Sequence, residues 1–199
     1  MEARQAQEDI RLIKEMIEKT KKTAAKSGTY FILWTIIPIL AILGMYILHH
    51  LKNYQWIWLN WVVFTTVGII ITVILLIRRE SKENVKTYVQ IAIFSIWKAC
   101  GFAFILLGFI FPWVGLYSYQ TISVMVSVIA GIGVYATGGI TEWNLLKWCG
   151  ALWWFGALLM VMVDYQYRTL LIIPLLVFGY LLPGIILNRN YRQKGVSDA

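Results

Sequence analysis

The sequence predicts an all-α fold: a polytopic membrane bundle of six transmembrane helices, arranged as three hairpins and preceded by a cytoplasmic amphipathic helix. Composition is the first observation behind this prediction. Of the 199 residues, 59% are hydrophobic and 14% are charged, and the mean hydropathy is +0.67. These values lie well outside the range of ordinary soluble domains.

Segregation of charge is the second observation. Six runs are almost free of charged residues: 28–48, 56–77, 89–111, 120–139, 143–163 and 170–187. Each is close to the ~20 residues that a helix needs to cross about 30 Å of hydrocarbon. Only helices or closed barrels satisfy the backbone in lipid, and the runs lack the alternation of barrel strands. The predicted domains are therefore an amphipathic helix in 1–27, a transmembrane bundle in 28–188 and a basic tail in 189–199.

The third observation is the placement of Lys and Arg. The N-terminal segment, the loop after the second run and the C-terminus together hold fourteen of them, whereas the opposite loops hold Lys52 and Arg168. Cytoplasmic loops of membrane proteins carry this excess, so both termini are predicted to be cytoplasmic. We expect a multi-pass protein of the bacterial cytoplasmic (inner) membrane. The net charge of +8 is then a sign of topology and does not indicate a nucleic-acid partner.

The N-terminal segment contains an amphipathic pattern over residues 8–26. Ile10, Ile13 and Ile17 recur at helical spacing, and charged residues occupy the other face. One interpretation is that this helix lies on the inner membrane surface, where its basic residues meet anionic lipid. The other is that it docks a cytosolic partner or pairs with a second copy, since its apolar stripe resembles a short heptad seam.

Small residues and prolines predict how the helices pack. Ser123, Ser127, Gly131 and Gly139 are placed on one face of the fourth run, which predicts an interior helix in close contact with at least two others. Pro38 predicts a kink in the first run. The sixth run holds two prolines and two glycines, so it is predicted to be the most deformable helix, either packed as a kinked helix or moving as a gate.

Two short motifs indicate an internal repeat. Tyr-Gln occurs at three predicted external helix starts, in 54–55, 119–120 and 165–166, and Lys-x-Cys-Gly occurs in 98–101 and 147–150. These echoes favour three helical hairpins descended from one unit.

The stretch Gly-Tyr-Leu-Leu-Pro-Gly in 179–184 closes the sixth run, and a basic amphipathic segment leads into the first. This layout resembles a family of small six-span bacterial inner-membrane proteins with no established activity. The resemblance implies a six-span membrane protein and assigns no chemistry to any residue.

Lys98 is the sharpest functional indication, because it falls within about 3 Å of the centre of the third run along the helix axis. An exposed ammonium there costs about 3 kcal/mol, so the side chain is expected to face the bundle or a wet cavity. Three explanations remain open. Lys98 could be neutral, it could share a cytoplasm-facing water cavity with Lys147, or it could meet an anionic group from outside the chain.

The function that follows is binding or transport of an anionic or amphipathic small molecule or lipid through a cavity in the helix bundle. Lys98 and Lys147 would supply positive charge. The rest of the predicted site comes from the same two runs: Trp97, Cys100, Trp148, Trp153 and Trp154. The alternative is a regulatory or scaffold protein that uses residues 8–26 to dock a partner.

No catalytic group, metal site or cofactor is predicted. The two histidines fall at the external end and the two cysteines in the inner half of the membrane, so a Cys-His pair would have to cross it. Phosphate-loop and zinc-protease motifs are missing from the sequence. We therefore expect a protein that is not an enzyme.

A rim is predicted at the external end. Asp164 and Arg168 are four residues apart across a short turn and are expected to pair, an interaction of about 0 to 1 kcal/mol if exposed. With Trp113 and Tyr117 they would shape the external mouth of the bundle.

Overall fold

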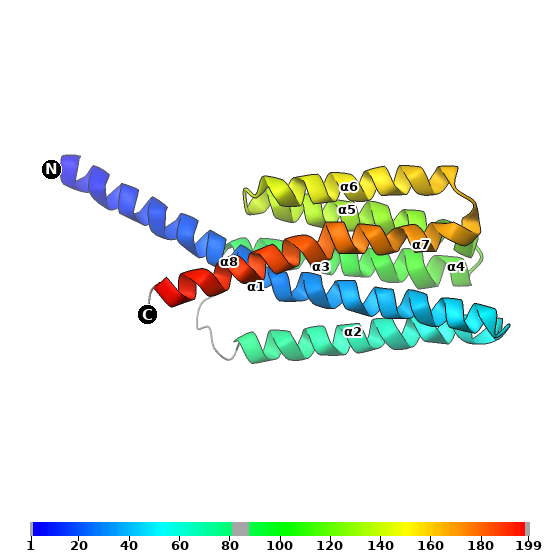
Figure 1. Cartoon of the computed structure of the whole chain (residues 1–199). Helices are drawn as coiled ribbons and strands as arrows, with labels where there is room; N and C mark the ends of the chain where they lie inside the picture. The colour runs from blue at the N-terminus through cyan, green and yellow to red at the C-terminus, as the bar shows by residue number, and fades with distance from the viewer. Residues whose placement is uncertain (1, 81–87, 198–199) are drawn as a thin grey trace.

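The computed structural model describes residues 2–80 and 88–197, and the regular structure in these residues is helical (Figure 1). The elements are α1 (Glu2–His50), η1 (Tyr54–Trp56), α2 (Ile57–Glu80), α3 (Tyr88–Ile105), η2 (Leu106–Ile110), α4 (Phe111–Trp113), η3 (Tyr119–Thr121), α5 (Ile122–Ile140), α6 (Asn144–Met162), α7 (Tyr165–Leu176), η4 (Val177–Leu181) and α8 (Leu182–Ser197).

Six helical segments in this part of the chain are long and apolar enough to cross a membrane. They are Gly28–His50, Tyr54–Arg78, Tyr88–Trp113, Tyr119–Ile140, Asn144–Met162 and Tyr165–Arg189. Each overlaps one of the predicted runs, so the all-helical fold and the count of six are confirmed.

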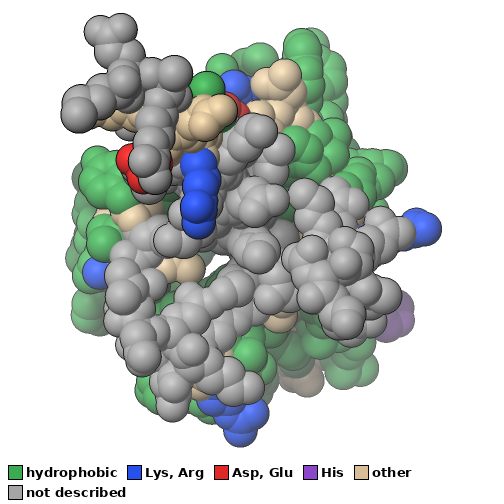
Figure 2. Space-filling model, turned by 90° about the vertical axis from the view of Figure 1, so that its left-hand side faces the viewer, with side chains coloured by type: hydrophobic (Ala, Val, Ile, Leu, Met, Phe, Trp, Pro, Cys, Tyr) green, Lys and Arg blue, Asp and Glu red, His purple; other side chains and the backbone are tan. Residues whose placement is uncertain are grey.

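Both chain termini lie at the same end of the bundle, with the turn between α5 and α6 (Figure 1). The turn between α1 and α2, the segment α4 and the turn between α6 and α7 lie at the opposite end. Figure 2 looks onto the end that carries the termini, and apolar side chains cover the flanks of the bundle around it. This distribution agrees with helices whose outer surfaces face lipid.

The first helix is one continuous element of 49 residues. Its N-terminal part projects beyond the bundle, with its axis oblique to the other helices (Figure 1). Residues 8–26 are predicted to form a helix separate from the first span, but the helical backbone continues through Gly28 without a break. The side chains of residues 12–27, and with them most of the predicted apolar stripe, lie outside the described residues.

The bundle is built around α5, which packs most extensively against α6 and also contacts α3 and α7. The prediction that this helix is interior is therefore confirmed. The second large interface joins α1 to α8. Within the predicted hairpins, α1 contacts α2, α3 contacts α5, and α6 contacts α7, but the α5–α6 interface crosses from the second predicted hairpin to the third.

Glycines set the close approach of α5 and α6. A Cβ on Gly131 would lie 2.4 Å from Nε1 of Trp154, and one on Gly138 would lie 2.7 Å from the backbone nitrogen of Lys147. The predicted stripe of small residues is correct for Ser123, Ser127 and Gly131, which are buried. It is wrong for Gly139, where a Cβ would meet nothing within 4 Å. Gly138 makes the close contact with α6 instead, two residues before α5 ends at Ile140.

Two helices contain a π-helical turn. The turn η2 precedes Pro112, and η4 follows Pro174 in the predicted deformable helix. A π-helical turn weakens the regular ladder of backbone bonds and leaves carbonyl groups for other partners. Tyr117 donates to the carbonyl of Leu107 in η2, and the thiol of Cys149 donates to the carbonyl of Phe178 in η4 at 3.5 Å.

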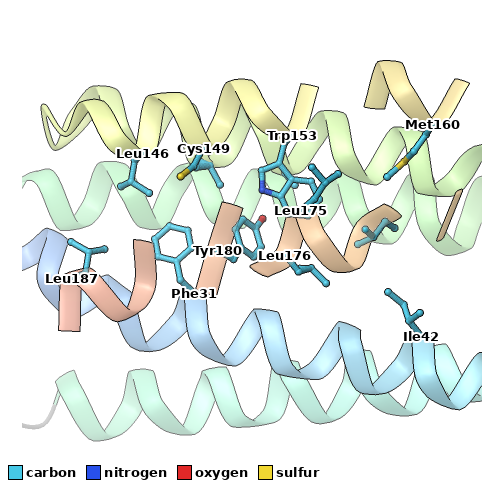
Figure 3. Packing of buried hydrophobic residues seen from close by; sticks show 13 residues of the cluster. Phe31, Ile42, Leu146, Cys149, Trp153, Met160, Leu175, Leu176, Tyr180 and Leu187 are labelled. Carbon is cyan, nitrogen blue, oxygen red and sulfur yellow. The ribbon is translucent and has the colours of Figure 1, made fainter. Parts of the chain in front are cut away.

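The buried core lies between α1 and α6, with α7, η4 and α8 passing through it (Figure 3). Its members include Phe31, Leu146, Trp153 and Tyr180, each at most 5% exposed. By contrast, α2 and α3 contribute few buried residues and lie at the periphery of the bundle.

Candidate functional site

Lys98 lies on the outer face of α3, exposed. The buried stripe of the same helix runs through Ile93 and Cys100, so the lysine does not face the bundle as the sequence analysis expected. Its Nζ atom is 4.6 Å from the centre of the Phe94 ring. A cation over an aromatic face is stabilised by about 0.5 to 2 kcal/mol, depending on how far it is desolvated.

The depth of Lys98 follows from the span Tyr88–Trp113, which has 26 residues. At 1.5 Å per residue this segment is about 39 Å long, so it extends past a hydrocarbon layer of about 30 Å by about 4 to 5 Å at each end. The Cα of Lys98, ten residues after Tyr88, then lies about 10 Å inside the hydrocarbon. Because Nζ lies over a ring one turn nearer the start of α3, the charge is about 5 Å inside it.

The interior at this level is filled by aromatic rings. Tyr180 packs with ring centroids 5.5 Å from Phe31, 6.0 Å from Trp97 and 5.0 Å from Trp153. Nε1 of Trp97 donates to Oγ1 of Thr137 at 3.1 Å, which joins α3 to α5. This cluster unites Trp97 and Trp153 of the predicted site with Phe31 and Tyr180, which the sequence analysis did not select.

Trp153 is 1% exposed, and its buried indole nitrogen has no hydrogen-bond partner among the described residues. It points at the backbone of η4, since a Cβ on Gly179 would lie 2.4 Å from Nε1. Figure 3 shows the indole beside Tyr180 in the middle of the core. An unpaired buried donor of this kind costs about 1 to 3 kcal/mol.

The remaining predicted ligand residues are dispersed. Trp148 is 74% exposed on the outside of α6. Trp154 donates through Nε1 to the carbonyl of Val128 and stacks on Tyr135 at 5.3 Å. Lys147 is half-buried near the turn between α5 and α6. The structure therefore brings Trp97, Cys100 and Trp153 into the interior and leaves the two lysines outside it.

The two Lys-x-Cys-Gly motifs occupy equivalent places. Cys100 and Cys149 are both buried. The thiol of Cys100 donates to the carbonyl of Ile129 at 3.9 Å and that of Cys149 to the carbonyl of Phe178 at 3.5 Å, and in both cases the partner is 29 residues further along the chain. Each cysteine thus ties its helix to the next membrane-crossing helix in the same register.

The predicted rim is only partly formed. Nε of Arg168 donates to the carbonyl of Val163 at 3.0 Å, while Asp164 precedes α7 as an exposed residue. Arg168 thus has a backbone partner, and no ion pair between it and Asp164 is seen among the described residues. Trp113 is 77% exposed. Tyr117 is half-buried and bonded to η2, and burial raises its pKa above the ordinary value of 10.0.

Two hollows on the described surface are apolar, and neither contains a lysine. One, of about 170 Å³, lies between α6 and α7 and is lined by Leu152, Phe155, Gly156, Leu159, Leu171, Pro174, Leu175 and Phe178. The other is an open hollow of about 450 Å³ beside the end of α1, lined by Leu43, Tyr46, Ile47, His50 and Leu51. Lys98 and Lys147 thus share neither of these hollows.

Within the described residues, no three His, Cys, Asp or Glu side chains gather as metal ligands would. Comparison of the chain with protein-family models, curated proteins and solved structures finds no match. The resemblance to small six-span bacterial inner-membrane proteins remains a prediction.

Proposed function

We propose that this protein binds an anionic amphipathic molecule, a lipid or a lipid-like compound, from within the membrane at the outer face of α3. The observation that carries the proposal is the exposed Lys98 inside a membrane span. A lysine that faces hydrocarbon costs about 3 kcal/mol at the centre of a bilayer, and extension of its side chain toward the headgroups lowers this cost. None of the six spans contains an Asp or Glu, so an anionic molecule from the membrane would supply a negative charge that the spans lack.

The proposal moves the predicted site from the interior to the surface of the bundle. Aromatic rings occupy the interior between Trp97 and Trp153, and the described hollows contain neither Lys98 nor Lys147. A surface site needs no cavity through the bundle. Binding is accordingly the proposed activity, and transport is not required by it.

Native mass spectrometry of the detergent-purified protein tests this function. The wild type is expected to carry an anionic amphipathic adduct, and Lys98→Gln is expected to lose most of it. Lys98→Arg should retain it, and Lys147→Gln is the matched control for the loss of one positive charge. Equal adduct occupancy in wild type and Lys98→Gln would contradict the proposal.

A second candidate function is favoured by the projecting part of α1. A helix that would lie flat in the membrane surface runs perpendicular to the spans, whereas this segment is oblique to the bundle and points away from it (Figure 1). We propose that residues 8–26 can instead dock a cytosolic partner or a second copy. Deleting residues 1–24 separates the two functions, because it should abolish partner binding and leave the adduct at Lys98 unchanged.

The proposal includes an inner-membrane location in bacteria, with both termini in the cytoplasm. The fourteen-to-two distribution of Lys and Arg supports this orientation, as do termini at one end of the molecule. It also includes descent of the three helical hairpins from one unit, supported by the equivalent bonds of Cys100 and Cys149. Labelling of single cysteines introduced at Lys52 and near the C-terminus tests the orientation: reagent added outside intact cells should reach residue 52 alone.

A further inference from the structure

We infer that the anionic group at Lys98 is the phosphate of a phospholipid from the leaflet at the end that carries both chain termini. The inference rests on the proposed binding at α3 and names the class of ligand and its leaflet. Four observations support it: the direction of the lysine, its depth, the apolar surface around it and the lack of acidic residues in the spans.

The direction of the side chain selects the leaflet. Nζ lies over Phe94, which is four residues closer to the start of α3. That start, at Tyr88, is at the end of the bundle where the termini lie (Figure 1). Lysines near a membrane boundary extend in this way toward the headgroups of the nearer leaflet.

The depth of the charge fits a headgroup drawn slightly inward. The lysine nitrogen lies about 5 Å inside the hydrocarbon boundary when one helical turn is subtracted from the depth of its Cα. Local thinning of the bilayer closes gaps of this size. A phosphate contacting Nζ therefore needs only a small displacement of its lipid from the mean headgroup plane.

The surface around the lysine suits an acyl chain. Ile91 and Phe102 are exposed on the same side of α3, and Phe102 is 68% exposed. The hydroxyl of Ser95 donates to the carbonyl of Ile91 at 2.8 Å, so it is not available to donate to a lipid headgroup. Lys98 thus offers one strong cationic donor above an apolar strip, which matches the layout of a phospholipid.

Other occupants fit less well. A second copy in symmetric contact would bring its own Lys98 to the same depth, where like charges repel, and its spans also lack carboxylates. A fatty acid has a carboxylate whose pKa rises on desolvation, so it loses charge where it is needed. A phosphodiester keeps its charge and accepts strong bonds from an ammonium.

The test reconstitutes the full-length protein in nanodiscs of phosphatidylcholine with a minor fraction of phosphatidylglycerol, or of oleate in a second series. Bound lipids are then counted by native mass spectrometry. We expect phosphatidylglycerol to be enriched on the wild type and on Lys98→Arg, and to fall about five- to tenfold on Lys98→Gln, the effect of one charge-assisted contact. Lys147→Gln should behave as wild type, and circular dichroism checks that every variant is folded.

Moving the charge along α3 tests the leaflet. In Lys98→Gln/Ile91→Lys the lysine is two turns nearer the end with the termini, and enrichment should return. In Lys98→Gln/Phe102→Lys it is one turn further away, near the middle of the hydrocarbon and distant from both headgroup layers, so enrichment should stay lost. The opposite order of these two variants would overturn the assignment of the leaflet.

The remaining outcomes separate the inference from the proposed function. If oleate enrichment depended on Lys98 and phosphatidylglycerol were not enriched, the assignment of the anionic group as a phosphate would be overturned. The proposed binding of an anionic amphipathic molecule at α3 would remain. No dependence of either lipid on Lys98 would overturn both. A protein dimer seen for the wild type but not for Lys98→Gln would show that a second copy, rather than a lipid, contacts Lys98. This outcome would also overturn the inference.

Discussion

Gly138 and Gly139 are adjacent in the chain, and the structure assigns them opposite roles. A Cβ on Gly138 would lie 2.7 Å from the backbone nitrogen of Lys147 and 2.9 Å from Cβ of Leu146. Backbone atoms cannot yield as the end of a side chain can, so Gly138→Ala should force α5 and α6 apart. Overpacking of this kind costs about 1 to 3 kcal/mol. Gly139→Ala meets nothing within 4 Å and should be stabilising by about 0.5 to 1 kcal/mol, the usual gain of Ala over Gly in a helix.

The two variants can be compared by unfolding in mixed micelles with increasing dodecyl sulfate, followed by tryptophan fluorescence and circular dichroism. We expect Gly138→Ala to unfold at a lower dodecyl sulfate fraction than wild type and Gly139→Ala at the same or a higher fraction. The pair differ by one position and share a chemical change, so lipid and detergent effects cancel between them. If Gly139→Ala were as destabilising as Gly138→Ala, the register of α5 against α6 described above would be refuted.

Three further predictions use the same unfolding assay. Glu142 has φ of 53° in the turn after α5. Because a left-handed conformation costs a residue other than Gly about 1 to 2 kcal/mol, Glu142→Gly should be stabilising by about 1 kcal/mol. A loss of stability would instead indicate that the Glu142 carboxylate makes a stabilising interaction. Trp97→Phe removes the donor to Thr137 and should cost about 0.6 kcal/mol, the typical value between membrane helices, with a double-mutant cycle against Thr137→Val checking that the loss is shared. Asp164→Asn should change the free energy of unfolding by less than about 0.5 kcal/mol. Arg168→Gln should lower it by about 1 kcal/mol, because the bond to the Val163 carbonyl is lost. Equal effects of the two variants would instead indicate an ion pair between Asp164 and Arg168.

The number and positions of the spans could be predicted because the membrane imposes a length and excludes charge. Apart from α5, whose small residues mark its buried face, the orientation of the helices about their axes could not. In water the buried face of a helix is more apolar than the exposed face, but in lipid both faces are apolar. Trp148 and Trp153 lie in one run and are equally hydrophobic, yet the first is 74% exposed and the second 1%. The prediction that Lys98 faces the bundle rests on the cost of an ammonium in hydrocarbon, but the side chain lies on the outer face of α3 and extends toward its start.

Local backbone geometry accounts for the partner that Arg168 has in the structure. Residues four apart contact each other when both belong to a helix. Asp164 has φ of −54° and ψ of 142° and stands before the first turn of α7, so its side chain does not share a helical face with Arg168. The arginine instead reaches back to Val163. Asp is a residue type that is common at the N-cap of helices, so Asp164 itself indicated where α7 begins.

The closest contact between α1 and α8 lies where the projecting segment of α1 begins. A Cβ on Gly28 would lie 2.6 Å from the carbonyl oxygen of Gly184, and one on Gly184 would lie 3.0 Å from that of Gly28. The two backbones touch at the point where α1 leaves the bundle, and about 40 Å of the same helix continues beyond it. Because one continuous helix carries both the projecting segment and the first span, a partner that displaced this segment would act on the backbone contact between Gly28 and Gly184.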